Sequence, residues 1–150
     1  YKRTGSMVLV DIDDFASVNA QNGVAMGDLL LTCLAGVILS NIRGMDRAGR
    51  FDGEKFLLFL PETDEKGAEA FTQRMQTKMA AIADAIAGIG LTFSSGIVVA
   101  PRDGSEFEVL RERLYSAVRF AKARQKGSIV VWSRDIAESA STDGHAVKEI

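Results

Sequence analysis

The chain has 150 residues, 47% of them hydrophobic, which predicts one domain with a sizeable core. Its net charge of −2 excludes a general positive field for nucleic acid or anionic lipid, and its single cysteine, Cys33, excludes a disulfide scaffold and a cysteine-rich zinc site. We expect a cytoplasmic protein without direct membrane contact, because we find no signal peptide and no apolar run long enough to span a bilayer. The start at Tyr1, shortly before a strand, suggests a segment cut from a longer protein.

A strand buried on both faces is predicted for the continuous apolar run Met7–Val10. Asp11, Ile12, Asp13 and Asp14 follow it directly. Three carboxylates at a strand end repel one another unless a cation lies among them. The pattern therefore indicates either a site for a hard divalent cation or a solvated strand end in which Asp13 or Asp14 caps a helix.

Two helices are predicted next. The first covers Phe15 to Asn22 and ends at Gly23, and Gly27 with Asp28 opens the second. Apolar residues of the second helix recur at helical spacing, so it should pack on a sheet: Leu29, Leu30, Cys33, Leu34, Val37 and Ile38.

A β-hairpin is predicted around Asp52 and Gly53, which separate the strand-like runs Ala48–Phe51 and Phe56–Leu60. Asp-Gly between two such runs is the strongest short-range hairpin signal, because a type I′ turn needs positive φ at both central residues. Most Asp-Gly tips are only turns, although this one carries several charged side chains: Arg50, Asp52, Glu54 and Lys55.

Two more helices and two more strands complete the predicted domain. Thr63 or Asp64 caps a long helix whose core stripe is Ala68, Phe71, Met75, Met79, Ile82 and Ile86. A strand over residues 91–99 follows, and then Ser105 and Glu108 form a capping box for another helix. That helix has an apolar face and a basic cluster. Its apolar face is Phe107, Leu110, Leu114, Ala117, Val118 and Ala121, and the cluster is Arg119, Lys122, Arg124 and Lys126.

The predicted order β-α-α-β-β-α-β-α-β indicates an α+β, ferredoxin-like sandwich. We expect a mainly antiparallel sheet of about five strands with helices on its faces. The domain is predicted to cover residues 1–132, ending in a strand over residues 129–132, and residues 133–150, with His145, to form a polar tail or linker. Carboxylates of residues 11–14 and of Glu54 can then meet at one sheet edge and hold Mg²⁺ with a triphosphate.

These motifs resemble the GGDEF domain of diguanylate cyclases, which join two GTP molecules into cyclic di-GMP, and the likeness runs from about Ser6 to Trp132. Asp11-Ile12-Asp13-Asp14-Phe15 is similar to the Asp-Ile-Asp-x-Phe of the family. The loop Arg50-Phe51-Asp52-Gly53-Glu54-Lys55-Phe56 lies where the family has Arg-Tyr-Gly-Gly-Asp/Glu-Glu-Phe. The resemblance implies a nucleotidyl-cyclase-type fold, metal ligation by Asp11, the Ile12 carbonyl and Glu54, and catalytic roles for Asp11 and Glu54.

Further motifs imply nucleotide-binding residues. Asn19, Gly23, Gly27 and Asp28 match the Asn-x-x-x-Gly-x-x-x-Gly-Asp of the family, in which the first and last residues bind guanine. Lys122 and Lys126 fall where the Ala-Lys-x-x-Gly-Arg-Asn motif places phosphate-binding cations. Arg43 and Asp46 match the Arg-x-x-Asp inhibitory site, which binds cyclic di-GMP, although this short pattern also occurs by chance as a surface ion pair. Arg50 and Arg74 would complete its cationic patch.

The signature motif is degenerate. Asp52 replaces the first glycine, and Lys55 reverses the charge of an acidic position. Ala16 lacks the usual lysine, and Gln125 and Gly127 depart from the last motif. Together these changes weaken the electrostatic stabilisation on which phosphoryl transfer depends.

Two functions remain open from the sequence. The first is a degenerate GGDEF domain that binds cyclic di-GMP or GTP and regulates a neighbouring sensor or EAL-type domain, with little or no cyclase activity. The alternative is an active diguanylate cyclase that condenses two GTP into cyclic di-GMP. For either function a homodimer is a further possible state.

Overall fold

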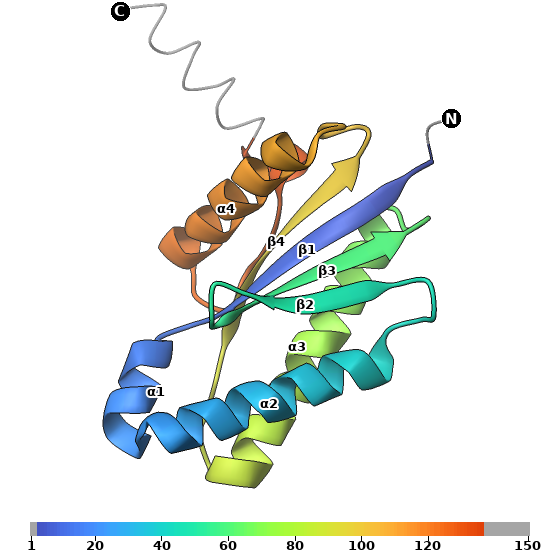
Figure 1. Cartoon of the computed structure of the whole chain (residues 1–150). Helices are drawn as coiled ribbons and strands as arrows, with labels where there is room; N and C mark the ends of the chain where they lie inside the picture. Colours follow the sequence, from blue (N-terminus) through green and yellow to red (C-terminus); the bar gives the residue numbers. More distant parts are fainter. Residues whose placement is uncertain (1–2, 137–150) are drawn as a thin grey trace, which may run out of the picture.

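The computed structural model describes residues 3–136, which form a five-stranded sheet with helices on both faces (Figure 1). The elements are β1 (Gly5–Ile12), α1 (Phe15–Asn22), α2 (Val24–Asn41), β2 (Arg47–Phe51), β3 (Lys55–Pro61), α3 (Glu65–Ala87), β4 (Phe93–Ala100), α4 (Phe107–Arg124), β5 (Ile129–Val131) and the π-helical turn η1 (Trp132–Ile136). This order confirms the predicted succession of strands and helices.

The sheet has the strand order β2-β3-β1-β4-β5. The central strand β1 pairs antiparallel with β3 and with β4, and only the β4–β5 pair is parallel. All eight residues of β1 are buried, as its apolar run predicted. The register sets Asp11 opposite Lys55 on β3 and opposite Ser94 on β4, so the end of β1 is flanked by residues of two strands.

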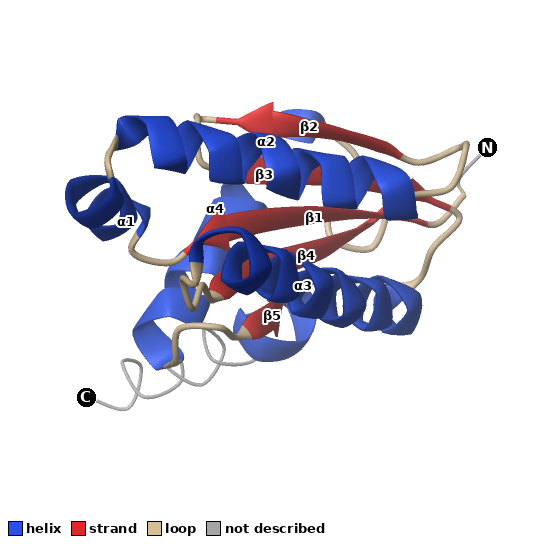
Figure 2. Ribbon diagram, turned by 90° about the horizontal axis from the view of Figure 1, so that it is seen from below, coloured by secondary structure: helices blue, strands red, loops and turns tan. Residues whose placement is uncertain are grey.

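Helices α2 and α3 cover one face of the sheet, and α4 covers the other (Figure 2). Side chains of β1 alternate between the two faces, as a strand requires: Val8 and Val10 pack toward α2 and α3, whereas Met7 and Leu9 pack toward α4. Gly96 on β4 lets α4 approach the sheet, because a Cβ there would lie 2.7 Å from the Cβ of Ala117.

Several local expectations need correction. Helix α2 begins at Val24, directly after Gly23, rather than at Gly27. No side chain caps α4, whose N-cap is Glu106, so the capping box predicted from Ser105 is wrong. The buried stripe of α3 follows Ala68, Thr72, Met75, Met79 and Ala83. The predicted stripe placed Ile86 in the core, but its side chain is exposed in the last turn of α3, and Phe107 is exposed at the first turn of α4.

Helix α2 is long and apolar enough to cross a membrane by length and composition, with a mean hydropathy of 1.7. The expectation that no apolar run has that length is therefore wrong. In this structure the helix packs on the sheet through Leu30, Leu34 and Ile38, which are fully buried. The core helix of a soluble domain meets the same criterion, so the helix is weak evidence for a membrane span.

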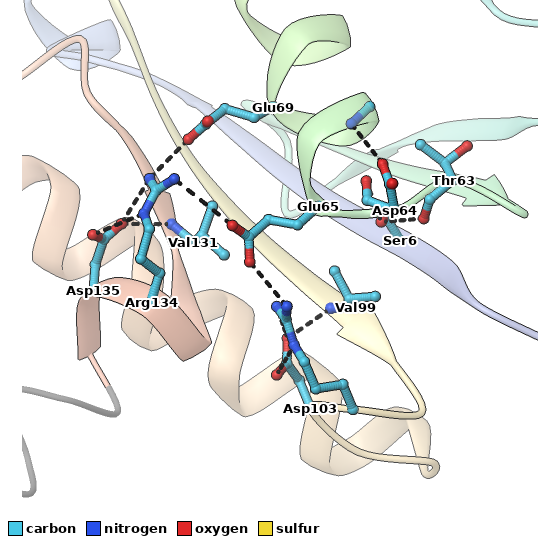
Figure 3. Close-up of polar contacts among 12 residues, drawn as sticks. Ser6, Thr63, Asp64, Glu65, Glu69, Val99, Asp103, Val131, Arg134 and Asp135 are labelled. Atoms are coloured by element: carbon cyan, nitrogen blue, oxygen red, sulfur yellow. Dashed lines mark hydrogen bonds and ion pairs between the residues drawn. The ribbon is translucent and has the colours of Figure 1, made fainter.

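Ionic contacts join the start of α3 to the β4–α4 loop and to η1 (Figure 3). Arg134 donates to Glu69 at 2.7 Å, and Arg102 donates to Glu65 at 2.9 Å and to Asp103 at 3.0 Å. Contacts with the domain thus continue past residue 132, through η1. Residues 137–150, which hold most of the predicted polar tail and His145, lie outside the described residues.

Candidate functional site

The aspartates at the end of β1 form an ionic cluster with two lysines, one in the last turn of α4 and one just after this helix. Lys122 Nζ lies 3.0 Å from Asp13 Oδ1 and 3.6 Å from Asp11 Oδ2. Lys126 Nζ lies 2.8 Å from Asp14 Oδ2. The structure therefore brings the predicted phosphate-binding lysines to the predicted acidic residues, and each lysine pairs with at least one carboxylate.

Asp11 is buried between two ammonium groups. Its Oδ2 lies 3.6 Å from Lys122 Nζ and 4.0 Å from Lys55 Nζ, while its Oδ1 is buried and accepts no hydrogen bond from residues 3–136. Burial raises the pKa of the Asp11 carboxyl and the nearby charge of Glu54 raises it further, whereas both lysines lower it. The predicted approach of the Glu54 and Asp11 carboxylates stays a prediction.

Asp13 connects β1 to β4 and to the loop after α4. Its carboxylate accepts hydrogen bonds from the hydroxyls of Thr92 and Ser94, both at 2.7 Å, and from the Gly127 backbone N–H at 3.0 Å. Burial raises the pKa of Asp13, but these hydroxyl bonds and Lys122 more than offset that effect, so the pKa is lowered overall. These partners were not predicted, because they lie far from Asp13 along the chain.

Asp14 takes the N-cap position of α1 with a left-handed φ of 56°, but its side chain makes no capping hydrogen bond. Its carboxylate is exposed and bonds to Lys126 instead. Of the alternative of a solvated strand end with some helix capping, the structure thus bears out the N-cap position and the exposure of Asp14, whereas Asp11 and Asp13 are buried.

The signature loop forms the predicted hairpin tip. Asp52 and Gly53 both have positive φ, 51° and 80°, as a tight tip requires. The strands pair from Phe51 to Lys55, so the tip has three residues rather than the two of a type I′ turn. Phe56, the last residue of the signature, is buried in the core.

Tyr115 on α4 holds the tip against the rest of the domain, and Arg50 braces it within the hairpin. The hydroxyl of Tyr115 on α4 donates to Asp52 Oδ2, and the rings of Tyr115 and Phe51 are 6.1 Å apart. Arg50 donates from Nε and Nη2 to the Gly53 carbonyl at 3.0 and 2.8 Å. Tyr115 was missed by sequence reasoning, since only the helical register of α4 could have suggested that it faces the tip.

The predicted guanine-binding residues lie on α1 and α2. Gly27 allows these helices to meet closely, because a Cβ at this position would lie 1.8 Å from Asn19 Oδ1. That oxygen is buried and has no hydrogen-bond partner in the part of the chain that the structure describes, whereas Asp28 is exposed one residue after Gly27. Asn19 thus offers an acceptor that none of the described residues uses.

The Arg-x-x-Asp motif closes on itself in the bend between α2 and β2. Asp46 Oδ2 accepts the Arg43 backbone N–H at 2.9 Å, and Asp46 Oδ1 accepts Arg43 Nη2 at 3.0 Å. The same Nη2 donates to the Pro61 carbonyl and to Thr63 Oγ1. Asp46 is 3% exposed, so this carboxylate has a structural role beside any ligand role.

A pocket of about 260 Å³ lies beside this motif and is lined by Asn41, Arg43, Asp46, Leu60, Thr63, Gly67, Phe71 and Arg74. The guanidinium carbon of Arg74 lies 6.0 Å from the centre of the Phe71 ring. Arg50 does not line the pocket, because β2 separates Asp46 at one end from the hairpin tip at the other. The prediction that Arg50 completes this cationic patch is therefore wrong, whereas Arg74 lies where it was predicted.

A divalent cation fits the predicted metal residues poorly. Two ammonium groups already flank Asp11 Oδ2, and their positive charge repels a metal ion at the same carboxylate. Among the described residues, no group of three or more acidic, histidine or cysteine side chains is arranged to hold an ion. Two features favour the metal site predicted at Asp11, Ile12 and Glu54: the free Oδ1 of Asp11 and the negative charge of Glu54. The site stays a prediction.

Comparison with known proteins gives one family match. The family described as "Diguanylate cyclase, GGDEF domain" matches residues 1–128. The response regulator PleD of Caulobacter vibrioides is 29% identical over 129 residues, which are 83% of this chain and 28% of that protein. The cyclic di-GMP phosphodiesterase NbdA of Pseudomonas aeruginosa is 28% identical over 149 residues, which are 97% of this chain and 19% of that protein. The chain thus spans less than a third of the length of these relatives.

The fold has solved counterparts. The GGDEF domain of DgcB from Caulobacter crescentus, solved in complex with cyclic di-GMP, superposes with a TM-score of 0.77. The match covers 87% of this chain and 78% of that chain at 21% sequence identity. This likeness confirms the cyclase-type α+β fold that the sequence predicted.

Proposed function

The chain belongs to the GGDEF diguanylate cyclase family, and we propose that it acts in bacterial second-messenger signalling as a regulatory module that binds cyclic di-GMP, with little or no cyclase activity. The observation that carries this proposal is the pocket that joins Arg43 and Asp46 to Arg74 and Phe71. These residues come from the α2–β2 bend and from α3, so the fold assembles the pocket from segments about 30 residues apart.

The chemistry of this pocket suits a cyclic dinucleotide. The Arg43 side chain is 55% exposed, and within residues 3–136 its Nη1 makes no hydrogen bond, so it can donate to a phosphate. Arg74 is an exposed second cation, and the Phe71 ring beside it offers a surface for a guanine base. Two guanidinium groups and an aromatic ring match the phosphates and bases of cyclic di-GMP.

The signature loop supports weak or absent catalysis. Asp52 adds a carboxylate at the tip where the family has glycine, and Tyr115 holds that carboxylate in place. Lys55 lies beside Asp11, where the family has an acidic residue. Both changes alter the charges that would stabilise the moving phosphoryl group, which is the main catalytic contribution in phosphoryl transfer.

GTP is the second candidate ligand. The unpartnered Oδ1 of Asn19 favours it, because a buried acceptor of this kind is costly unless a ligand donates to it. GTP bound by Asn19, Asp28, Lys122 and Lys126 would make the chain a GTP sensor. The alternative of an active cyclase would use the same residues for turnover.

The proposed setting is the cytoplasm, with a sensor or EAL-type domain beside this one and a homodimer as a further state. The support for neighbouring domains is that the chain spans 28% of PleD and 19% of NbdA.

Isothermal titration calorimetry with cyclic di-GMP tests the binding proposal. Arg74→Ala should weaken binding by about twofold to fivefold, the size expected for one charge-assisted contact at an exposed site. Arg50→Ala is the matched control, because Arg50 contacts the hairpin tip and should leave the affinity unchanged. Equal affinities for the two variants, or no binding by the unchanged protein, would refute the proposal.

Product analysis after incubation with GTP and Mg²⁺ or Mn²⁺ tests the activity. Little or no cyclic di-GMP should form, even at high protein concentration. The double variant Asp52→Gly with Lys55→Glu should form more product than either single variant, because both residues act on one charged site. Ready product formation by the unchanged protein would support the active cyclase instead.

A further inference from the structure

Lys55 occupies an unusual place for a lysine. The register sets it directly opposite Asp11, and its ammonium lies 4.0 Å from Asp11 Oδ2. The side chains of Lys55 and Asp11 are only 18% and 10% exposed. A lysine and a carboxylate are seldom buried this far unless each compensates the charge of the other.

The other carboxylates of this cluster have their own partners. Asp13 is saturated by two hydroxyls, a backbone N–H and Lys122, and Asp14 pairs with Lys126. Asp11 differs, because the ammonium of Lys55, which follows Glu54 in the chain, adds a second positive charge beside a carboxylate that already faces Lys122. GGDEF cyclases are generally metal-dependent, so the donor set of this chain disagrees with its family at this one point.

We propose that the Lys55 ammonium takes the place of a divalent cation beside Asp11, so that a nucleoside triphosphate binds at this edge of the sheet without metal. An ammonium has three donors and can bridge a carboxylate and a phosphate oxygen, as a metal ion does by coordination. Lys122, 31% exposed and 3.6 Å from the same carboxylate, supplies a second cation for the triphosphate. This inference rests on the proposed nucleotide-binding role but on a different site from the pocket at Arg74.

Metal titration of the whole 150-residue chain is the first test. The unchanged protein should show no saturable binding of Mn²⁺ by calorimetry and no increase in Tm when Mn²⁺ is added. Lys55→Glu should gain both responses, because the new carboxylate joins Glu54 and the free Oδ1 of Asp11. Lys66→Glu makes the same charge change at an exposed lysine of α3 and should gain neither.

Lys55→Gln is a second variant in case Lys55→Glu does not fold. It removes the ammonium without adding a carboxylate. It should keep the circular dichroism of the unchanged protein and bind Mn²⁺ more weakly than Lys55→Glu. Mn²⁺ binding by the unchanged protein as tight as that of Lys55→Glu would overturn the inference, and so would a folded Lys55→Glu or Lys55→Gln variant without any Mn²⁺ response.

Titration with GTP in EDTA and again in Mg²⁺ is the second test. The two affinities should agree within about threefold, and Lys55→Gln should weaken binding in EDTA by about tenfold. A requirement for Mg²⁺, or no GTP binding in either buffer, would overturn the inference. A parallel titration with cyclic di-GMP separates this failure from failure of the proposed function, since that ligand is assigned to the Arg74 pocket.

Discussion

Replacing Asp46 by alanine is expected to lower the free energy of unfolding by about 1–3 kcal/mol, the cost of leaving a buried donor without an acceptor. The Asp46 side chain is 2% exposed, and its Oδ2 accepts the Arg43 backbone N–H at 2.9 Å. Alanine leaves this N–H unpaired in the bend between α2 and β2. The contacts to the Arg43 guanidinium add little to this figure, because that group is exposed to water.

Urea unfolding followed by circular dichroism measures this loss, and thermal unfolding should show a Tm lower by about 2–10 °C for a domain of this size. Asp46→Asn is the matched control, because the amide oxygen can still accept the N–H and most of the stability should remain. Asn and Ala variants of equal stability would refute the reasoning, since they would show that the backbone hydrogen bond contributes nothing.

Two further predictions concern packing and pH. Gly96→Ala should lower the free energy of unfolding, measured by urea titration, by about 1–3 kcal/mol, because the new Cβ would lie 2.9 Å from the Leu114 carbonyl oxygen. Gly36→Ala, on the open surface of α2, is the control and should be neutral or stabilising. Burial raises the pKa of the Asp13 carboxyl, but its hydrogen bonds lower this pKa overall. The ionised carboxylate therefore stabilises the fold above the ordinary pKa of 3.8, and this stabilisation is lost as the pH falls through the lower pKa of the folded state. Asp13→Asn should therefore flatten the acid decline of Tm, and an unchanged decline would contradict this assignment.

Much of the fold was predictable because its signals are local. The buried run of β1, the tip at Asp52 and Gly53, and the cap of α3 at Asp64 each depend on a few neighbouring residues, and the structure confirms them. The capping box at Ser105 failed because such a pattern permits a cap without requiring one. Short-range patterns thus predicted the elements better than their ends.

The sequence predicted most residues of the candidate site, but it did not predict which side chains they contact. Arg43 and Arg74 were assigned to one site and line one pocket, but Arg50 was assigned with them and instead caps the hairpin tip. The Thr92 hydroxyl reaches Asp13 across 79 residues of chain, and Tyr115 reaches Asp52 across 63. No spacing rule covers such distances, because they are set by strand order and helix packing rather than by local sequence.

Asp52 and Lys55, the two residues of the signature loop that differ from the family, each have a charge that should weaken catalysis, and each has a partner in the folded domain. The carboxylate of Asp52 would repel a nucleotide phosphate, but it accepts a hydrogen bond from the hydroxyl of Tyr115 on α4. The ammonium of Lys55 would repel a metal ion, but it lies beside the carboxylate of Asp11. Both contacts hold the hairpin in place without nucleotide or metal. Since a charge with a protein partner is more costly to remove than a solvated one, restoring glycine and glutamate at these positions would also break contacts that now stabilise the loop. Any recovered catalysis should therefore come with a loss of stability, and a reverted variant that gained activity at no cost in Tm would show that these contacts contribute little.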